Sequence, residues 1–177
     1  MINNIKKRLF KRCLQNNKPH REKRITSLEQ VKTMALVCQI TDENSYKEMY
    51  ALFSKLHTHN RSVWLLGYID ERKVPYYCLQ QLTADFFSKK ELNWFGKPNF
   101  IQLNDFLNKD FDILIDFSRN DLAPLRYVLS ASKAKLLTGA NNYAQDLYDL
   151  FFKDYEGMND LKLLKIIHDY LLKLTGK

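Results

Sequence analysis

The sequence predicts an α/β protein: a Rossmann-like three-layer sandwich with a mostly parallel sheet, preceded by a basic N-terminal helix. Short, nearly continuous apolar runs recur along the chain, as expected of strands that are buried on both faces. The two strongest runs, MALVCQI and FDILIDFS, are each followed by a segment with apolar residues at helical spacing. This alternation of strand and helix is typical of parallel sheets covered by helices on both faces.

A basic amphipathic helix is expected at the start of the chain. It should end near residues 16–17, because Pro19 follows and cannot continue a helix. Its apolar residues are spaced by three, four and four positions and therefore share one face: Ile2, Ile5, Leu9 and Cys13.

The first strand–helix–strand unit follows this helix. Residues 34–40 form the first expected strand, and Thr41-Asp42 can cap the next helix. The apolar residues of that helix recur at helical spacing between 46 and 56. Residues 62–70 form the second expected strand.

The middle of the chain carries weaker signals. Residues 76–87 are expected to be extended, as in an edge strand, and Ser88 should cap a short turn. NWFGKP at 93–98 indicates a tight turn punctuated by glycine and proline. Its two large aromatic side chains, Trp94 and Phe95, are expected to be buried against the domain.

A second alternating unit occupies the C-terminal half. A short helix near 103–107 precedes the strongest strand, 111–118, and Asp121 is expected to cap the following helix, with Pro124 in its first turn. Two short strands and a last helix capped by Asn159 complete the expected fold; they span residues 134–139, 148–152 and 160–174.

Charge divides the chain into two parts. The first 24 residues contain nine Lys or Arg and a single acid, Glu22. Removing them from the totals of 28 basic and 20 acidic residues leaves 19 of each in residues 25–177. The sequence therefore predicts a basic amphipathic arm, residues 1–24, attached to a single neutral Rossmann-like domain, residues 25–177.

Three scattered cysteines, Cys13, Cys38 and Cys78, have no paired or metal-type spacing and fit a reducing compartment. The longest apolar runs are far too short to cross a membrane. A cytoplasmic location is expected.

Ligands of open α/β sheets usually bind at the carboxyl ends of the strands. The polar residues expected there form a candidate ligand crevice: Thr41, Asp42, Asp116, Ser118 and Arg119. A small-molecule enzyme or binding protein that uses this crevice is one alternative for the function. The structural alternative is that these residues cap helices or face solvent and bind no ligand.

No catalytic motif accompanies these positions. There is no glycine-rich phosphate loop and no nucleophile elbow, so we expect no nucleotide cofactor and no catalytic residues. His57 and His59 lack a third ligand nearby in the sequence, so no metal site is expected. Asp110 and Asp112 flank the entrance of a strand, away from its ligand-binding end, and are interpreted as structural.

Two resemblances bear on the fold. Residues 111–140, FDILIDFSRNDLAPLRYVLSASKAKLLTGA, resemble one Rossmann-like half of heptosyltransferase-type glycosyltransferases, in scaffold positions only. Together with DFFSKKELNWFGKP, the same stretch resembles an uncharacterised family of small bacterial α/β proteins of unknown function, over nearly the whole chain. The second resemblance implies a cytoplasmic bacterial protein and brings no activity with it.

The basic arm provides the main functional hypothesis, a non-catalytic module that binds RNA or a ribonucleoprotein surface. An anionic membrane surface is an alternative partner. The structural alternative is that the helix only docks on the domain and its charges are solvated. The candidate nucleic-acid-binding residues are Lys6, Lys7, Arg8, Lys11, Arg12, Lys18, Arg21, Lys23 and Arg24.

Overall fold

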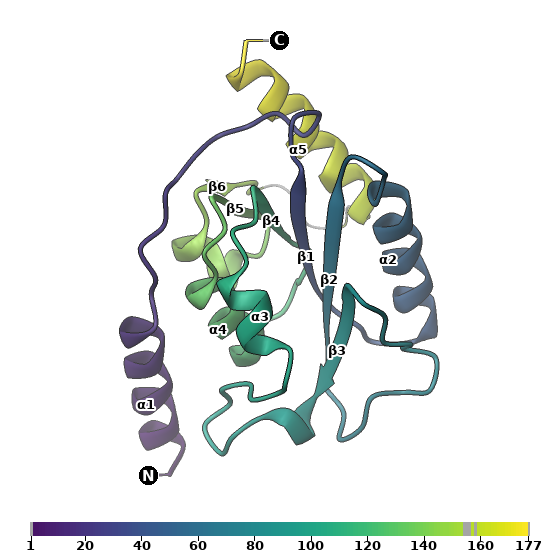
Figure 1. The fold of residues 1–177 in the computed structure, drawn as a ribbon. Helices are drawn as coiled ribbons and strands as arrows, with labels where there is room; N and C mark the ends of the chain where they lie inside the picture. Colours follow the sequence, from purple (N-terminus) through teal and green to yellow (C-terminus); the bar gives the residue numbers. More distant parts are fainter. Residues whose placement is uncertain (1, 154–156, 158, 177) are drawn as a thin grey trace.

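The computed structural model describes residues 2–153, 157 and 159–176 (Figure 1). The strands are β1 (Thr33–Gln39), β2 (Ser62–Ile69), β3 (Ala84–Ser88), β4 (Ile113–Asp116), β5 (Leu136–Gly139) and β6 (Leu150–Phe151). The α-helices are α1 (Ile2–Asn16), α2 (Glu43–Leu56), α3 (Leu103–Asn108), α4 (Ala123–Ala131) and α5 (Asp160–Leu174). Two short 3₁₀ helices are η1 (Lys89–Glu91) and η2 (Asn142–Leu147).

The six strands form one parallel sheet in the order β3-β2-β1-β4-β5-β6. The two strongest apolar runs lie side by side at its centre, with Met34 of β1 opposite Ile113 of β4. This confirms the predicted α/β fold, and the order is that of doubly wound Rossmann sheets. The chain turns from one half of the sheet to the other between β1 and β4, so their carboxyl ends form the topological switch point.

Two hydrophobic cores cover the two faces of the sheet. Alternate side chains of β1 enter different cores: Leu36 packs with α2 and α5, whereas Val37 packs with α3 and α4. Because both faces of β1 are buried, the strand reads as a continuous apolar run rather than an alternating one.

Helix α1 lies outside these three layers, against α4 (Figure 1). Phe10, Cys13 and Leu14 pack against the edge of the α3–α4 core, and the Ser130 hydroxyl of α4 donates to the Leu14 carbonyl at 3.3 Å. The chain then runs along the molecule to β1, and on the way the Arg24 amide donates to the Lys135 carbonyl at 3.2 Å. The arm predicted at residues 1–24 is therefore docked on the domain.

Several predicted caps are confirmed. Asp42 and Ser45 form a reciprocal capping box at the start of α2, and Ser88 begins η1 in the same way with Glu91. The Asn159 side chain accepts from the Lys162 amide at 2.9 Å at the start of α5. Gly96 adopts a φ of 95°, which explains glycine in the predicted 93–98 turn.

Three expectations need correction. Asp121 does not cap α4, because Leu122 is the capping residue and the Asp121 carboxylate faces Arg126 at 3.7 Å instead. Only the last part of the extended segment predicted at 76–87 lies in the sheet, as the edge strand β3. Trp94 is 58% exposed and stacks edge-on against Phe95 rather than entering the core.

Candidate nucleic-acid interface

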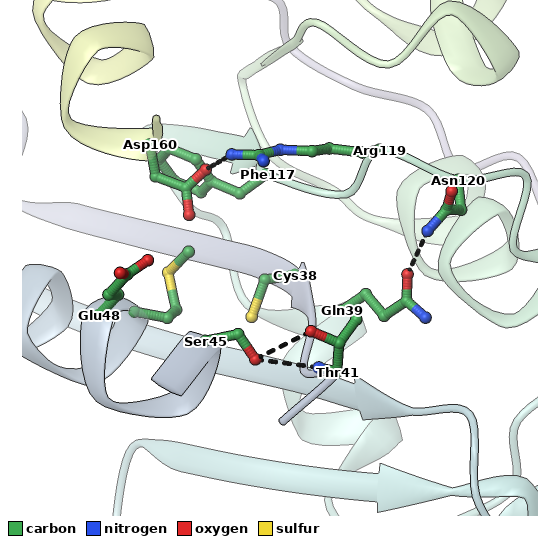
Figure 2. Close-up of a pocket in the computed structure, with 10 residues that line it drawn as sticks. Cys38, Gln39, Thr41, Ser45, Glu48, Phe117, Arg119, Asn120 and Asp160 are labelled. Carbon is green, nitrogen blue, oxygen red and sulfur yellow. Dashed lines mark hydrogen bonds and ion pairs between the residues drawn. The ribbon is translucent and has the colours of Figure 1, made fainter. Parts of the chain in front are cut away.

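The predicted crevice residues lie at the carboxyl ends of β1 and β4, but the structure divides them between two environments. Thr41 and Arg119 line a small hollow of about 140 Å³ at the switch point (Figure 2). Asp116 and Ser118 belong instead to a buried polar network on the β5 side. Asp42 caps α2.

Charged groups at and beside the small hollow are already bonded to other groups of the chain. Arg119 forms an ion pair of 2.7 Å with Asp160, the first residue of α5. At the N-terminus of α2 the Asp42 carboxylate accepts from the Ser45 amide at 2.8 Å, and this hydrogen bond lowers the pKa of Asp42. In a dinucleotide-binding Rossmann fold, this helix N-terminus would hold the pyrophosphate. Here a carboxylate satisfies it.

The buried network centres on Asp116, which is 0% exposed. The Tyr148 hydroxyl donates to Asp116 at 2.5 Å, and the Ser118 amide and hydroxyl donate at 2.8 and 2.9 Å. Burial raises the pKa of Asp116 to about 6, against the opposing effect of these hydrogen bonds. The Asn141 amide extends the network by donating to the Ser118 hydroxyl at 2.9 Å.

A larger groove, with a volume of about 550 Å³, is lined by residues of α1, of the start of α4 and of η2. One wall carries Lys7, Lys11 and Lys18, of which the first two lie one helical turn apart. The floor includes the apolar side chains of Phe10 and Leu147. Across the groove stands Arg126, held by two acids and one carbonyl.

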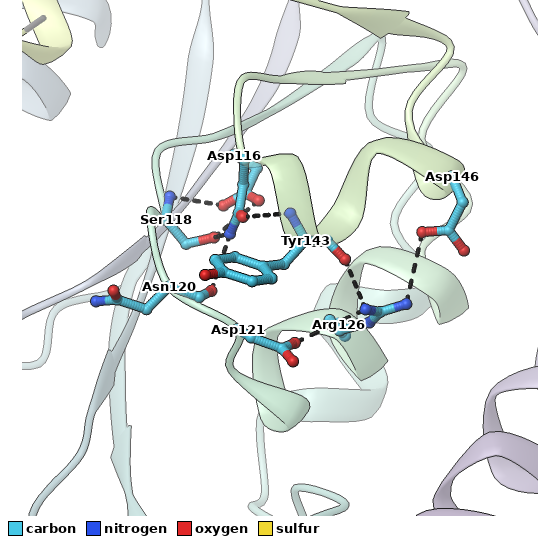
Figure 3. Close-up of polar contacts among 8 residues, drawn as sticks. Asp116, Ser118, Asn120, Asp121, Arg126, Tyr143 and Asp146 are labelled. Carbon is cyan, nitrogen blue, oxygen red and sulfur yellow. Dashed lines mark hydrogen bonds and ion pairs between the residues drawn. The ribbon is translucent and has the colours of Figure 1, made fainter. Parts of the chain in front are cut away.

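Those contacts of Arg126 are well defined (Figure 3). Its guanidinium donates to the Tyr143 carbonyl at 2.6 Å and lies 3.7 and 3.5 Å from Asp121 and Asp146. The charged residues of the far wall, Asp121, Arg126 and Asp146, are thus slightly acidic in sum, whereas those of the α1 wall are all basic.

The nine predicted basic residues behave differently in the structure. Arg21 is turned inward: its side chain donates to the Ala134 carbonyl and pairs with Asp149, which also binds Lys23 at 2.8 Å. Burial alone would raise the pKa of Asp149, but hydrogen bonds from Lys23, the Leu137 amide and Arg21 lower it overall. Arg21 therefore anchors the chain after α1.

The remaining cations face outward. Most of them are exposed, Lys6 is half-buried, and none takes part in an ion pair among the residues that the structure describes. They are Lys6, Lys7, Arg8, Lys11, Arg12, Lys18 and Arg24.

Three further observations concern metal ligands, membrane spans and the acids at the entrance of β4. Within the described ranges, no three His, Cys, Asp or Glu side chains gather in a way that could hold a metal ion. In the same part of the chain, every helix is too short or too polar to cross a membrane. Asp112 bonds the backbone of Thr33 and pairs with Lys135 at 2.8 Å, which confirms its structural interpretation.

Sequence reasoning missed the partners of the site. Tyr148 and Asn141, which complete the Asp116 network, come from β5–β6 connections with no motif of their own. Arg126 lies within a helix, and nothing in the sequence around it marks it as part of a site. Only the three-dimensional arrangement of η2 against α4 brings these groups together.

Fold and surface together define a doubly wound α/β protein of the Rossmann type that carries an external basic helix. Within this class, the chain belongs to a family of unknown function, DUF6913, which it matches over residues 3–174 and therefore through both α1 and the domain. Searches among curated proteins and among solved structures find no match. The likeness of residues 111–140 to heptosyltransferases gains no support from these comparisons.

Proposed function

We propose that this protein is a non-catalytic module that binds RNA, free or on a ribonucleoprotein surface, through α1 and the segment behind it. The observation that carries the proposal is the outward face of α1. Lys7, Arg8, Lys11 and Arg12 are exposed there within six residues, on a helix without an acidic residue. Phosphates are the natural counterions of such a surface.

Docking makes these cations more effective than a loose tail would be. An isolated helix of 15 residues is marginal in water, so its charges would move with a fluctuating chain. Packing of Phe10, Cys13 and Leu14 on the domain holds the helix in place. A preformed array loses less conformational freedom on binding an anionic strand.

The switch-point hollow supports a small-molecule function less well. Its volume of about 140 Å³ lies below the roughly 300 Å³ at which ligand pockets usually begin. The Asp42 carboxylate at the N-terminus of α2 would also repel a phosphate. The preference for RNA over DNA rests on the cytoplasmic setting implied by the family resemblance, so matched DNA belongs in every test.

The test is the binding of a fluorescent single-stranded RNA to the full chain as salt is raised. About five phosphate contacts should give a slope of log K against log salt of roughly −3 to −4, because each contact on a single strand contributes about −0.7. A slope near zero, or no binding at low salt, would contradict the proposal. DNA of the same sequence that binds more tightly would redirect it to DNA.

An anionic membrane is the second candidate, favoured by one observation. Ile5 and Leu9 remain exposed on α1 beside Arg12, although the other apolar residues described on this helix pack on the domain. Two such side chains could enter a lipid interface while the cations meet the head groups.

Replacing Ile5 and Leu9 with Ser separates the two candidates. We expect the double variant to keep the RNA affinity of the parent, because phosphate contacts need only the cations. Vesicles of zwitterionic lipid, with and without anionic lipid, provide the comparison. If the variant loses vesicle binding while the parent binds vesicles more tightly than RNA, the membrane is the partner.

A further inference from the structure

A second hollow lies beside the α1 groove, at the carboxyl ends of β4 and β5. Its volume is about 450 Å³, and polar and apolar atoms contribute about equally to its lining. Residues of the loops after the two strands and of η2 form most of this lining: Arg119, Asn120, Asn141, Asn142 and Tyr143. Figure 3 shows Asn120 and Tyr143. The edge of the sheet at which it opens is the one where α/β proteins bind ligands.

Tyr143 is the notable residue of this hollow. Its side chain is 56% exposed, although tyrosine gains much from leaving water. Its backbone, in contrast, is held on both sides: the amide donates to the Asn141 side chain at 3.0 Å, and the carbonyl accepts from Arg126 at 2.6 Å. Asn141 is itself buried and bonded to Ser118 and to the Asn120 carbonyl. The exposed ring thus sits on a rigid support.

Arg126 connects this hollow to the groove along α1. It lines the groove with Lys7, Lys11 and Lys18, and it bonds the Tyr143 backbone directly. An extended anionic chain lying on the α1 lysines that continues past Arg126 would reach the loop that carries Tyr143. A polyanion without aromatic groups would use only the first part of this path.

We infer that the hollow takes one unpaired base of the RNA strand whose phosphates lie on α1, with the base stacked on the Tyr143 ring. This inference rests on the proposed function and adds the part of the ligand that is recognised. Stacking on an exposed aromatic accepts any base, because every base has a π-face. The Asn120 side chain donates to the Gln39 amide oxygen at 2.7 Å, and its own amide oxygen is an acceptor suited to a base edge.

The inference makes the ligand a single strand. In a duplex each base is stacked and paired, so it cannot reach the ring without costly unstacking. Double-stranded RNA should therefore bind through its phosphates alone, with no contribution from Tyr143.

The experiment compares three variants of the full chain: Tyr143→Ala, Tyr143→Phe and Tyr76→Ala. Tyr76 is the matched control, because it is 87% exposed and lies before the edge strand β3, at the opposite side of the sheet from β5. The probes are a single-stranded RNA, its duplex and inorganic polyphosphate, each titrated by fluorescence anisotropy or by competition at several salt concentrations.

We expect Tyr143→Ala to weaken single-strand binding on the order of tenfold, the effect of losing one stacked base. The salt slope should stay unchanged, because no phosphate contact is removed. Tyr143→Phe and Tyr76→Ala should bind as the parent does, and no variant should change its affinity for duplex or polyphosphate.

Two failures are distinguishable. If the parent binds single-stranded RNA with a steep salt slope and Tyr143→Ala binds it equally well, the stacking site is wrong while the proposed function stands. The stacking site is also wrong if Tyr143→Ala weakens the binding of polyphosphate and RNA alike. If the parent binds no RNA at all, both proposals fail together.

Discussion

Helices α1 and α5 have the same length, 15 residues, but opposite relations to the rest of the molecule. Helix α5 inserts Leu163, Ile167 and Leu171 into the core beside α2, each at 0% exposed surface. Helix α1 lies outside α4, and from Asn4 onward it contributes only partly buried side chains to the core, Phe10 and Leu14 among them. Helix α5 carries charges of both signs, whereas α1 carries five cations and no acid.

This comparison indicates that α5 is needed for the fold, whereas α1 is held on the outside of the fold. A helix without fully buried side chains adds little hydrophobic stabilisation. Five like charges within seven positions repel one another and oppose its formation. The features that make α1 a poor structural element are therefore those on which its proposed binding of a polyanion depends.

The largest expected effect tests the contrast directly. Ile167→Ala in α5 removes a fully buried side chain and should lower the free energy of unfolding by about 3–4 kcal/mol. Leu14→Ala in α1 should lower it by only about 1 kcal/mol, because Leu14 is partly exposed. Urea denaturation followed by circular dichroism measures both. Equal losses would show that α1 is as structural as α5.

The second prediction concerns Asp116, a buried carboxyl group of the domain, in contrast to the mostly exposed cations of α1. The pKa of Asp116 is about 6 in the fold and near 3.9 in an unfolded chain, so the folded state holds the proton more tightly. Its stabilising contribution is fully present below about pH 4 and is lost as the pH rises through about 6.

The variant Asp116→Asn lacks this titration and can keep hydrogen bonds with Tyr148 and Ser118. Relative to the parent, its free energy of unfolding should therefore rise by up to about 3 kcal/mol between about pH 4 and pH 7. Parallel urea titrations at several pH values measure the difference. A difference independent of pH would show that Asp116 is not the titrating group.

The third prediction concerns the anchor of the segment after α1. Asp149 binds Arg21, Lys23 and the Leu137 amide, so Asp149→Asn should lower the free energy of unfolding by about 2 kcal/mol at neutral pH. The pKa of Asp149 is lowered in the fold, so its contribution is present above about pH 4 and is lost as the pH falls through the folded value. Parent and variant should therefore converge in acid.

The control for this variant lies on α5. Asp169→Asn removes an exposed carboxylate next to His168 and should change the free energy of unfolding by less than about 0.5 kcal/mol. If the two variants behave alike, Asp149 does not anchor the chain.

The architecture could be predicted from the sequence, because strands that are buried on both faces consist of nearly continuous apolar residues. MALVCQI and FDILIDFS therefore predicted the two central strands, and Asp42, Ser88 and Asn159 marked helix starts by their capping chemistry. The prediction that Asp121 caps a helix was wrong, because a residue of a type that often caps helices can have another partner. The Asp121 carboxylate contacts Arg126 instead.

The candidate sites were less readable, because they depend on contacts across the fold. Strand-end rules placed Asp116 and Arg119 at the correct edge, but the pleat and the connecting loops decided which environment each one entered. The basic residues of α1 were evident from charge alone. That Arg21 would turn inward to Asp149 could not be seen without β5 and β6 in place.

A binding role for α1 is tested by the salt dependence of RNA binding in two matched double variants, Lys7→Gln with Lys11→Gln on α1 and Lys162→Gln with Lys165→Gln on α5. Both remove two exposed lysines, so the net charge of the protein changes equally. We expect the α1 variant to flatten the slope of log K against log salt by about 1.4, while the α5 variant leaves it unchanged. Equal changes in the two variants would mean that RNA responds only to overall charge and would contradict a binding role for α1.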